Sequence, residues 1–171
     1  MRSIKELRAA VGNASNEEQV REIIDELSQL QDVDALPLLL EILNSTPSSS
    51  IRNAAAMGLK DLGDKTVVPD LMKHITNPEN THTNGTLIYA IEALDAREFV
   101  SELAIMACNG DYETISMVLN AIESFQGPLE AGKRQEALDI LGKSLGDNSY
   151  PEWKREMLSE LYEIIDESDA V

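Results

Sequence analysis

Two histidines and one cysteine are the residues of this chain whose side chains most often bind metals or act as nucleophiles. His74 and His82 lie on either side of a proline-containing loop, without a cluster of further ligands around them in the sequence. Cys108 ends an apolar segment beside Met106 and Ala107, and no neighbouring histidine could activate its thiol. We therefore expect no metal site, and we interpret Cys108 as a small buried hydrophobic residue.

The 31 acidic residues could in principle supply a general acid and a general base, as in glycosidases. At this density, however, carboxylates usually form the solvated face of a helix, and nothing in their spacing singles out two of them. The sequence also lacks a phosphate-binding glycine loop, a calcium-binding loop and a glycine-flanked serine. We expect a protein that is not an enzyme and that has no cofactor.

The charge balance indicates the kind of partner. With 14 basic and 31 acidic residues the formal net charge is −17, so nucleic acid and anionic lipid would be repelled and a basic protein or peptide would be attracted. The single cysteine favours a reducing compartment, and we find no signal-peptide or membrane-spanning apolar segment. We expect a cytoplasmic protein.

The apolar residues recur three and four positions apart, as in Ile51, Ala55 and Leu59, which lines one face of an α-helix. Strands would need sustained alternation, and none occurs. Proline, glycine and serine clusters separate the periodic segments. Together these signals predict ten helices, at residues 3–12, 16–31, 34–44, 50–63, 66–76, 82–95, 97–108, 111–125, 130–145 and 151–167.

The helical pattern repeats along the chain with a period of about 32 residues. Shifting the sequence by this amount superimposes Leu27, Leu59 and Ile91, and six of the seven columns compared are apolar in three copies. A fourth copy follows with an insertion of about seven residues. We predict a single domain over residues 1–171, with repeats at about 16–46, 47–77, 78–109 and 110–146 and with terminal caps at 1–15 and 147–171.

The segment 50–75 resembles the HEAT-like repeat family, including the repeats of phycobilisome-lyase-type proteins. The resemblance rests on Arg52, the small residues 53–56, Leu59, the 62–64 sequence Leu-Gly-Asp, and Val68 with Pro69. It implies an all-α fold, a short α-solenoid (an α–α superhelix) of about four helix pairs with capping helices at both ends. It also implies that Arg52 and Asp64 occupy positions that often form a ladder between copies. Val20 and Asn84 replace Arg52 in the first and third copies, so we expect any such ladder to be broken here. The lone Gly58 inside a helix suggests the close approach of a neighbouring helix.

The second helix of each pair lines the concave side of the solenoid in this family. The residues of these helices that point outward form three rows. The first row is Leu38, Asp70, Glu102 and Ile140, the second is Glu41, Lys73, Ile105 and Lys143, and the third is Ile42, His74, Met106 and Ser144. From them we predict a partner-binding surface made of Asp70, Lys73, His74, Glu102, Ile105 and Met106. The alternative is that the polar residues are ordinary wet surface and that neighbouring copies bury the apolar ones.

The sequence therefore favours a non-enzymatic module that binds a basic protein or peptide. A specific version is an immunity or inhibitor protein that neutralises a basic toxin. Two alternatives stay open, a maturation factor resembling the bilin lyases and a subunit of a larger assembly. DNA glycosylases also occur among HEAT-like proteins, but residues 98–132 contain six acidic residues and no lysine or arginine, which excludes a phosphate-binding groove there.

Overall fold

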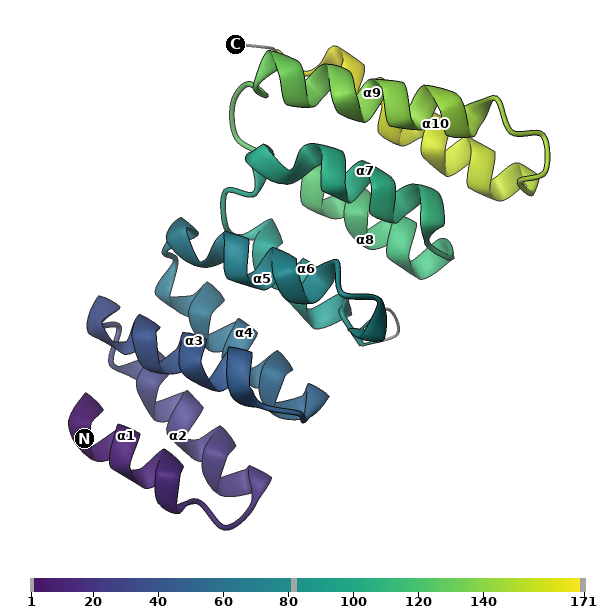
Figure 1. Cartoon of the computed structure of the whole chain (residues 1–171). Coiled ribbons are helices and arrows are strands. Elements are labelled where there is room, and N and C mark those ends of the chain that lie inside the picture. Colours follow the sequence, from purple (N-terminus) through teal and green to yellow (C-terminus); the bar gives the residue numbers. More distant parts are fainter. Residues whose placement is uncertain (1, 81–82, 170–171) are drawn as a thin grey trace. The chain divides into compact units, whose positions relative to one another are not determined.

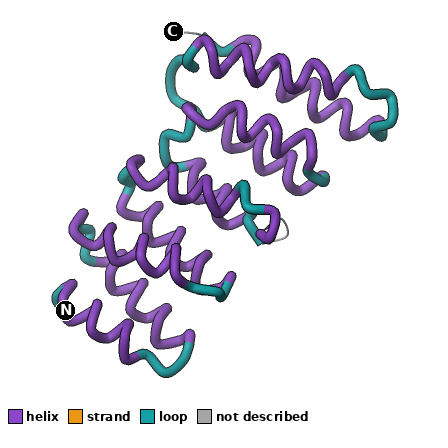
Figure 2. Tube along the Cα trace, in the orientation of Figure 1, coloured by secondary structure: helices purple, strands orange, loops and turns teal. Residues whose placement is uncertain are grey.

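A computed structural model describes residues 2–80 and 83–169 of the chain (Figure 1). These residues contain ten α-helices and no β-strand, and short loops join the helices (Figure 2). The helices are α1 (Ile4–Asn13), α2 (Glu17–Gln29), α3 (Leu36–Ser45), α4 (Ser49–Leu62), α5 (Val68–Ile75), α6 (Gly85–Glu92), α7 (Val100–Asn109), α8 (Tyr112–Glu123), α9 (Ala131–Leu145) and α10 (Glu152–Glu167).

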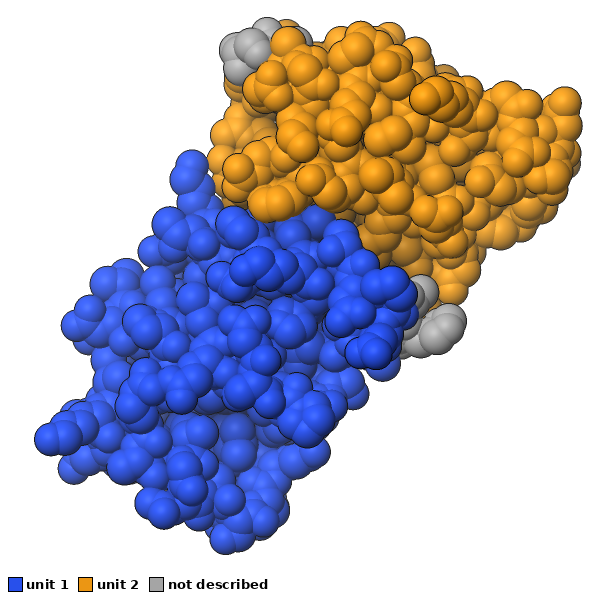
Figure 3. Space-filling model, in the orientation of Figure 1, with its two compact units in different colours: residues 1–94 blue, residues 95–171 orange. Residues whose placement is uncertain are grey.

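The chain divides into two compact units, Met1–Leu94 and Asp95–Val171 (Figure 3). The first unit contains α1 to α6 and the second contains α7 to α10. Each unit has its own buried apolar residues. That residues 1–171 form one domain stays a prediction.

In the first unit, α2 packs on α4 and α4 packs on α6, while α1 packs on α2, α3 on α4 and α5 on α6. The aligned residues Leu27, Leu59 and Ile91 are fully buried, as the 32-residue period predicts. In the second unit, α7 packs on α8 and α9, and α10 packs on the same two helices. The predicted all-α fold, built of stacked helix pairs as in an α-solenoid, is confirmed.

The second helices begin in the same way at intervals of 32 residues. Short 3₁₀ turns at Val33–Ala35, Lys65–Val67 and Arg97–Phe99 lead directly into α3, α5 and α7. Asp64 caps the second of these turns, because its carboxylate accepts a hydrogen bond from the Thr66 amide at 2.9 Å. Asp64 therefore caps its own loop.

Arg52 instead links α4 to the segment before α6. Its guanidinium donates to Asn80 Oδ1 at 2.6 Å, to Thr83 Oγ1 at 2.8 Å and to the Thr83 carbonyl at 3.2 Å. The side chain of Asn84, directly before α6, turns back and donates to the Ile75 carbonyl at 3.1 Å. Polar side chains therefore connect α4, α5 and α6, and the Arg52 contact between repeats is made without a carboxylate.

All ten predicted helices are present, with ends that differ from the prediction by at most three residues. The differences of three residues are at α6, which begins at Gly85 rather than 82 and ends at Glu92 rather than 95, and at the start of α7, which is Val100 rather than 97. His82, the first residue of this predicted helix, lies outside the described residues. α4 ends at Leu62 and is capped by Gly63, whose φ of 69° is the left-handed conformation that glycine adopts without strain.

Three side chains lie elsewhere than the periodicity indicates. Leu38 and Ile42 were predicted to point outward from α3, but they are only 1% and 4% exposed. The reason is that α3 packs on α4 and also has α1 and α5 beside it, so neighbours cover more than one of its faces. Trp153, which the helical spacing of apolar residues within 151–167 places on the apolar side of the last helix, is 39% exposed.

Candidate functional site

Asp70, Lys73 and His74, three of the predicted partner-binding residues, lie on α5. Lys73 Nζ forms an ion pair with Asp70 Oδ1 at 3.0 Å, and His74 Nε2 lies 2.9 Å from Asn44 Oδ1 on α3. Lys73 is exposed, whereas Asp70 and His74 are half-buried. A ligand at this place would therefore meet polar groups that already have partners within the unit.

His74 is held in its neutral form by its surroundings. Burial is the main cause that lowers the pKa of its imidazole, and the positive charges of Arg52 and Lys73 act in the same direction while Asp70 opposes them. His74 is consequently a poor source of positive charge at this surface.

We expect His74 to reduce stability in mild acid. Below the unfolded-state pKa of about 6.5 the unfolded chain binds more protons at this histidine than the folded chain does, so the free energy of unfolding falls as the pH falls towards the folded pKa. The variant His74→Gln should lose less stability than the wild type between neutral pH and pH of about 5.5. Urea unfolding at both pH values checks this, and equal losses in the two proteins would contradict it.

Glu102, Ile105 and Met106 lie on α7, in the second unit. Glu102 Oε1 is 3.7 Å from Lys133 Nζ on α9, so its charge is partly balanced. Ile105 is 47% exposed and Met106 is half-buried. The alternative that neighbouring helices bury the apolar residues does not describe Ile105.

The six predicted residues thus fall into two groups of three, one in each unit. Within each group the side chains follow each other on one helix, as their spacing predicts. Whether they bind a partner stays a prediction.

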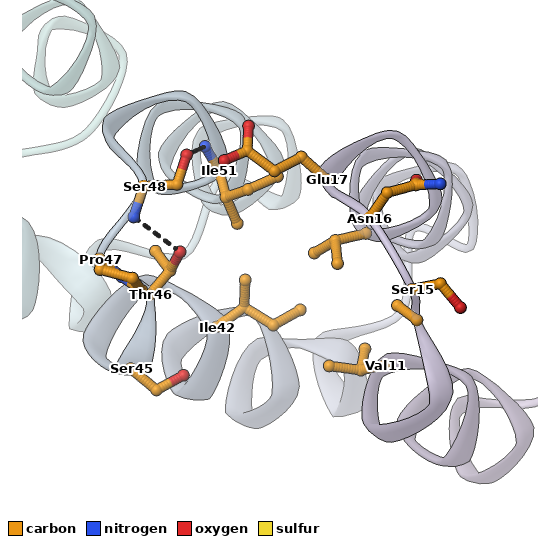
Figure 4. A pocket seen from close by; sticks show the side chains of 12 residues that line it. Val11, Ser15, Asn16, Glu17, Ile42, Ser45, Thr46, Pro47, Ser48 and Ile51 are labelled. Carbon is orange, nitrogen blue, oxygen red and sulfur yellow. Dashed lines mark hydrogen bonds between the residues drawn. The ribbon is translucent and has the colours of Figure 1, made fainter.

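A pocket of about 420 Å³ opens in the first unit between α1, α2, α3 and α4 (Figure 4). Its wall is mainly apolar, and Ile42, which the sequence assigned to the outer surface, is part of it. Figure 4 shows the Glu17 side chain extending from the start of α2 towards Ser48 and Ile51. The apolar part of the lining is Val11, Ala14, Val20, Ile42, Pro47 and Ile51.

Helix caps make up the polar side of this pocket. Asn16 Oδ1 accepts from the Gln19 amide at 3.0 Å, and Ser48 Oγ accepts from the Ile51 amide at 3.4 Å. Thr46 Oγ1 accepts from the Ser48 amide at 3.2 Å. Glu17 is the one charged residue among those that line the pocket, so an apolar group carrying a positive charge is the ligand type that fits it best.

Tyr112 and Trp153 form an exposed aromatic pair in the second unit. They are the first residue of α8 and the second residue of α10, and their ring centroids are 5.8 Å apart. Local sequence patterns do not pair them, since the contact joins residues 41 positions apart, one in the fourth predicted repeat and one in the C-terminal cap. The one signal in the sequence that could have drawn attention to these two residues is their rarity, because aromatic residues are only 4% of the chain.

The described residues include no group of three or more histidine, cysteine, aspartate or glutamate side chains that could hold a metal ion. Cys108 is buried near the end of α7, in agreement with its interpretation as a small hydrophobic residue. None of the helices that the structure describes is long and apolar enough to cross a membrane.

Residues 4–92 match the family model described as HEAT repeats. The match covers just over half of the chain, so the protein belongs to the HEAT-repeat family. HEAT repeats generally serve as scaffolds for protein interactions. No curated protein matches the chain.

Proposed function

We propose that this chain is a non-enzymatic protein-interaction module of the cytoplasm that binds a basic protein or peptide. In its most specific form it is an immunity or inhibitor protein that neutralises a basic toxin. Membership of the HEAT-repeat family supports the interaction role, and the charge of the surface supports the basic partner.

The distribution of charge in the second unit carries the proposal. Residues 95–171 include 17 acidic and six basic side chains, whereas residues 1–94 include 14 and eight. Four of the six basic side chains of the second unit are already bound within it: Arg97 to Asp95, Lys133 to Glu102, Arg134 to Asp166 and Lys154 to the Gly110 carbonyl. The excess of carboxylates therefore reaches the solvent and would attract a basic partner over long distances.

Apolar anchors close to carboxylates would give this attraction a fixed geometry. Ile105 is exposed one helical turn from Glu102, and the pocket in the first unit combines an apolar wall with Glu17. Since charge mainly raises the association rate and buried apolar groups mainly slow dissociation, the two features complement each other.

The experiment is a capture on the immobilised chain at low salt, followed by kinetics with the purified partner. The association rate is expected to fall steeply as salt rises from low to physiological strength, while the dissociation rate changes little. A neutral or acidic partner, or an association rate independent of salt, would overturn the proposal. For the toxin-neutralising form, adding the chain should abolish the toxin's activity at a one-to-one ratio.

The variant Ile105→Ser is expected to weaken binding of that partner by about tenfold, mainly through faster dissociation, because an exposed aliphatic anchor is lost without a change of charge. The matched control is Val33→Ser, which removes another exposed aliphatic side chain, in the first unit. Surface plasmon resonance measures both. Equal affinity of wild type and Ile105→Ser would remove Ile105 from the binding surface.

A further inference from the structure

Tyr112 and Trp153 leave much of their ring surface open to solvent. Tyr112 is 64% exposed, and the two ring planes are inclined at 58°. Aromatic pairs usually add stability by burial, but here most of the tyrosine and over a third of the tryptophan stay accessible. Tryptophan and tyrosine are the residue types that most often dominate binding energy at protein interfaces.

Three carboxylates lie close to the two aromatic residues in the sequence. Glu113 follows Tyr112 and Glu152 precedes Trp153, while Glu156 lies one helical turn beyond Trp153 on the same side of α10. All three are exposed. Of the two basic residues that follow Trp153, Lys154 is buried and its ammonium group donates to the Gly110 carbonyl at 2.8 Å. Arg155 is exposed, so the three carboxylates together with Arg155 still leave an excess of negative charge.

The chain already uses aromatic faces to hold cations. Lys154 Nζ lies 4.7 Å from the centre of the Tyr150 ring, at the same end of α10, and Lys60 Nζ lies 5.1 Å from the centre of the Tyr89 ring in the first unit. Such contacts are within the range of cation–π attraction. A guanidinium group suits two inclined rings even better, because it is planar and can stack on one ring while binding a carboxylate.

We propose that the Tyr112–Trp153 surface, with Glu113, Glu152 and Glu156 at its edge, binds arginine side chains of a basic partner. The partner's charge rests on the function proposed above, whereas the position of the site and the preference for arginine are additional. The surface lies on α8 and α10 of the second unit. It therefore differs from the surface predicted from the sequence, whose residues in this unit lie on α7.

The test uses a short capped arginine-rich peptide and its lysine counterpart as probes. Trp153 is the single tryptophan of the chain, so its fluorescence reports this site directly. We expect the arginine peptide to change the emission and to bind more tightly than the lysine peptide, and we expect Tyr112→Ala to weaken it by about five- to tenfold. An unchanged emission, or equal affinities of wild type and Tyr112→Ala, would overturn the inference.

A pair of charge-matched variants separates this site from the overall negative charge. The double variant Glu113→Gln/Glu152→Gln should bind the arginine peptide much more weakly than the wild type. The double variant Glu18→Gln/Glu22→Gln, on α2 of the first unit, should bind it with nearly unchanged affinity. Equal losses would mean binding by net charge alone, and the inference would fall while the proposed function stands. Sedimentation of the protein alone that shifts in Tyr112→Ala would show a second copy on this surface and would also overturn it.

Discussion

Replacing Arg52 by methionine is expected to lower the free energy of unfolding by about 2–3 kcal/mol. Methionine keeps most of the aliphatic volume but removes the three hydrogen bonds to Asn80 and Thr83. Asn80 is buried, and in the variant its Oδ1 atom has lost the arginine donor. A buried acceptor left without its donor costs more than the net strength of an ordinary hydrogen bond.

Two features of Arg52 keep this effect from being larger. Burial lowers the pKa of its guanidinium, which shows that taking the charge out of water has a cost that the variant no longer bears. The Nε atom is also buried without a hydrogen-bond partner. These costs offset part of the benefit of the three contacts.

Urea unfolding followed by far-ultraviolet circular dichroism measures the change, and Arg21→Met is the control. Arg21 is an exposed arginine on α2 whose guanidinium binds Ser50, so its loss should cost well under about 1 kcal/mol. Hydrogen exchange should also speed up in α6 of Arg52→Met, because Arg52 fixes the segment that precedes this helix. If Arg52→Met were as stable as Arg21→Met, the hydrogen bonds of Arg52 to Asn80 and Thr83 would have no net stabilising role.

The variant Gly58→Val is expected to cost about 2–3 kcal/mol, the second large effect. A β-carbon at Gly58 would lie 2.7 Å from Ser28 Oγ, 3.2 Å from Leu39 Cδ2 and 3.4 Å from Ile24 Cγ2. Ser28 can rotate away only by giving up its hydrogen bond to the Ile24 carbonyl, and Leu39 is fully buried. The clash therefore has to be relieved by moving α4 away from α2 and α3.

Gly142→Val, on α9, is the matched control. A β-carbon there would meet Tyr162 at an ordinary 3.9 Å, so this variant gains slightly from the better helix propensity of valine. The difference between the two variants isolates the close approach from propensity, and thermal or urea unfolding measures it. Similar stabilities would show that the α2–α3–α4 contact adapts easily.

The sequence indicated the close approach at Gly58 but not its partners. A glycine inside an otherwise regular helix requires a reason, and contact with a neighbouring helix was the predicted one. Which helices make the contact depended on how α2, α3 and α4 pack, and no local pattern encodes the residues Ser28 and Leu39.

The predicted surface shows where inference from periodicity ends. The outward rows were obtained by assuming that each second helix buries one face. This holds for Asp70, Lys73 and Ile105, which are partly or largely exposed, but it is wrong for Leu38 and Ile42. On α3 the apolar residues are dense enough to cover several faces, and a dense apolar helix is one that several neighbours surround.

The sequence by itself determined the ten helices, their pairing in a repeat of about 32 residues, and the acidic charge, because these depend on local spacing and composition. Only the tertiary structure decided that Arg52 binds Asn80 and Thr83, that Ile42 lines a pocket, and that Tyr112 meets Trp153 at the surface. These contacts join residues that are 28 or more positions apart or belong to different helices. Their geometry follows from how helices pack against each other, which the period of one helix does not specify.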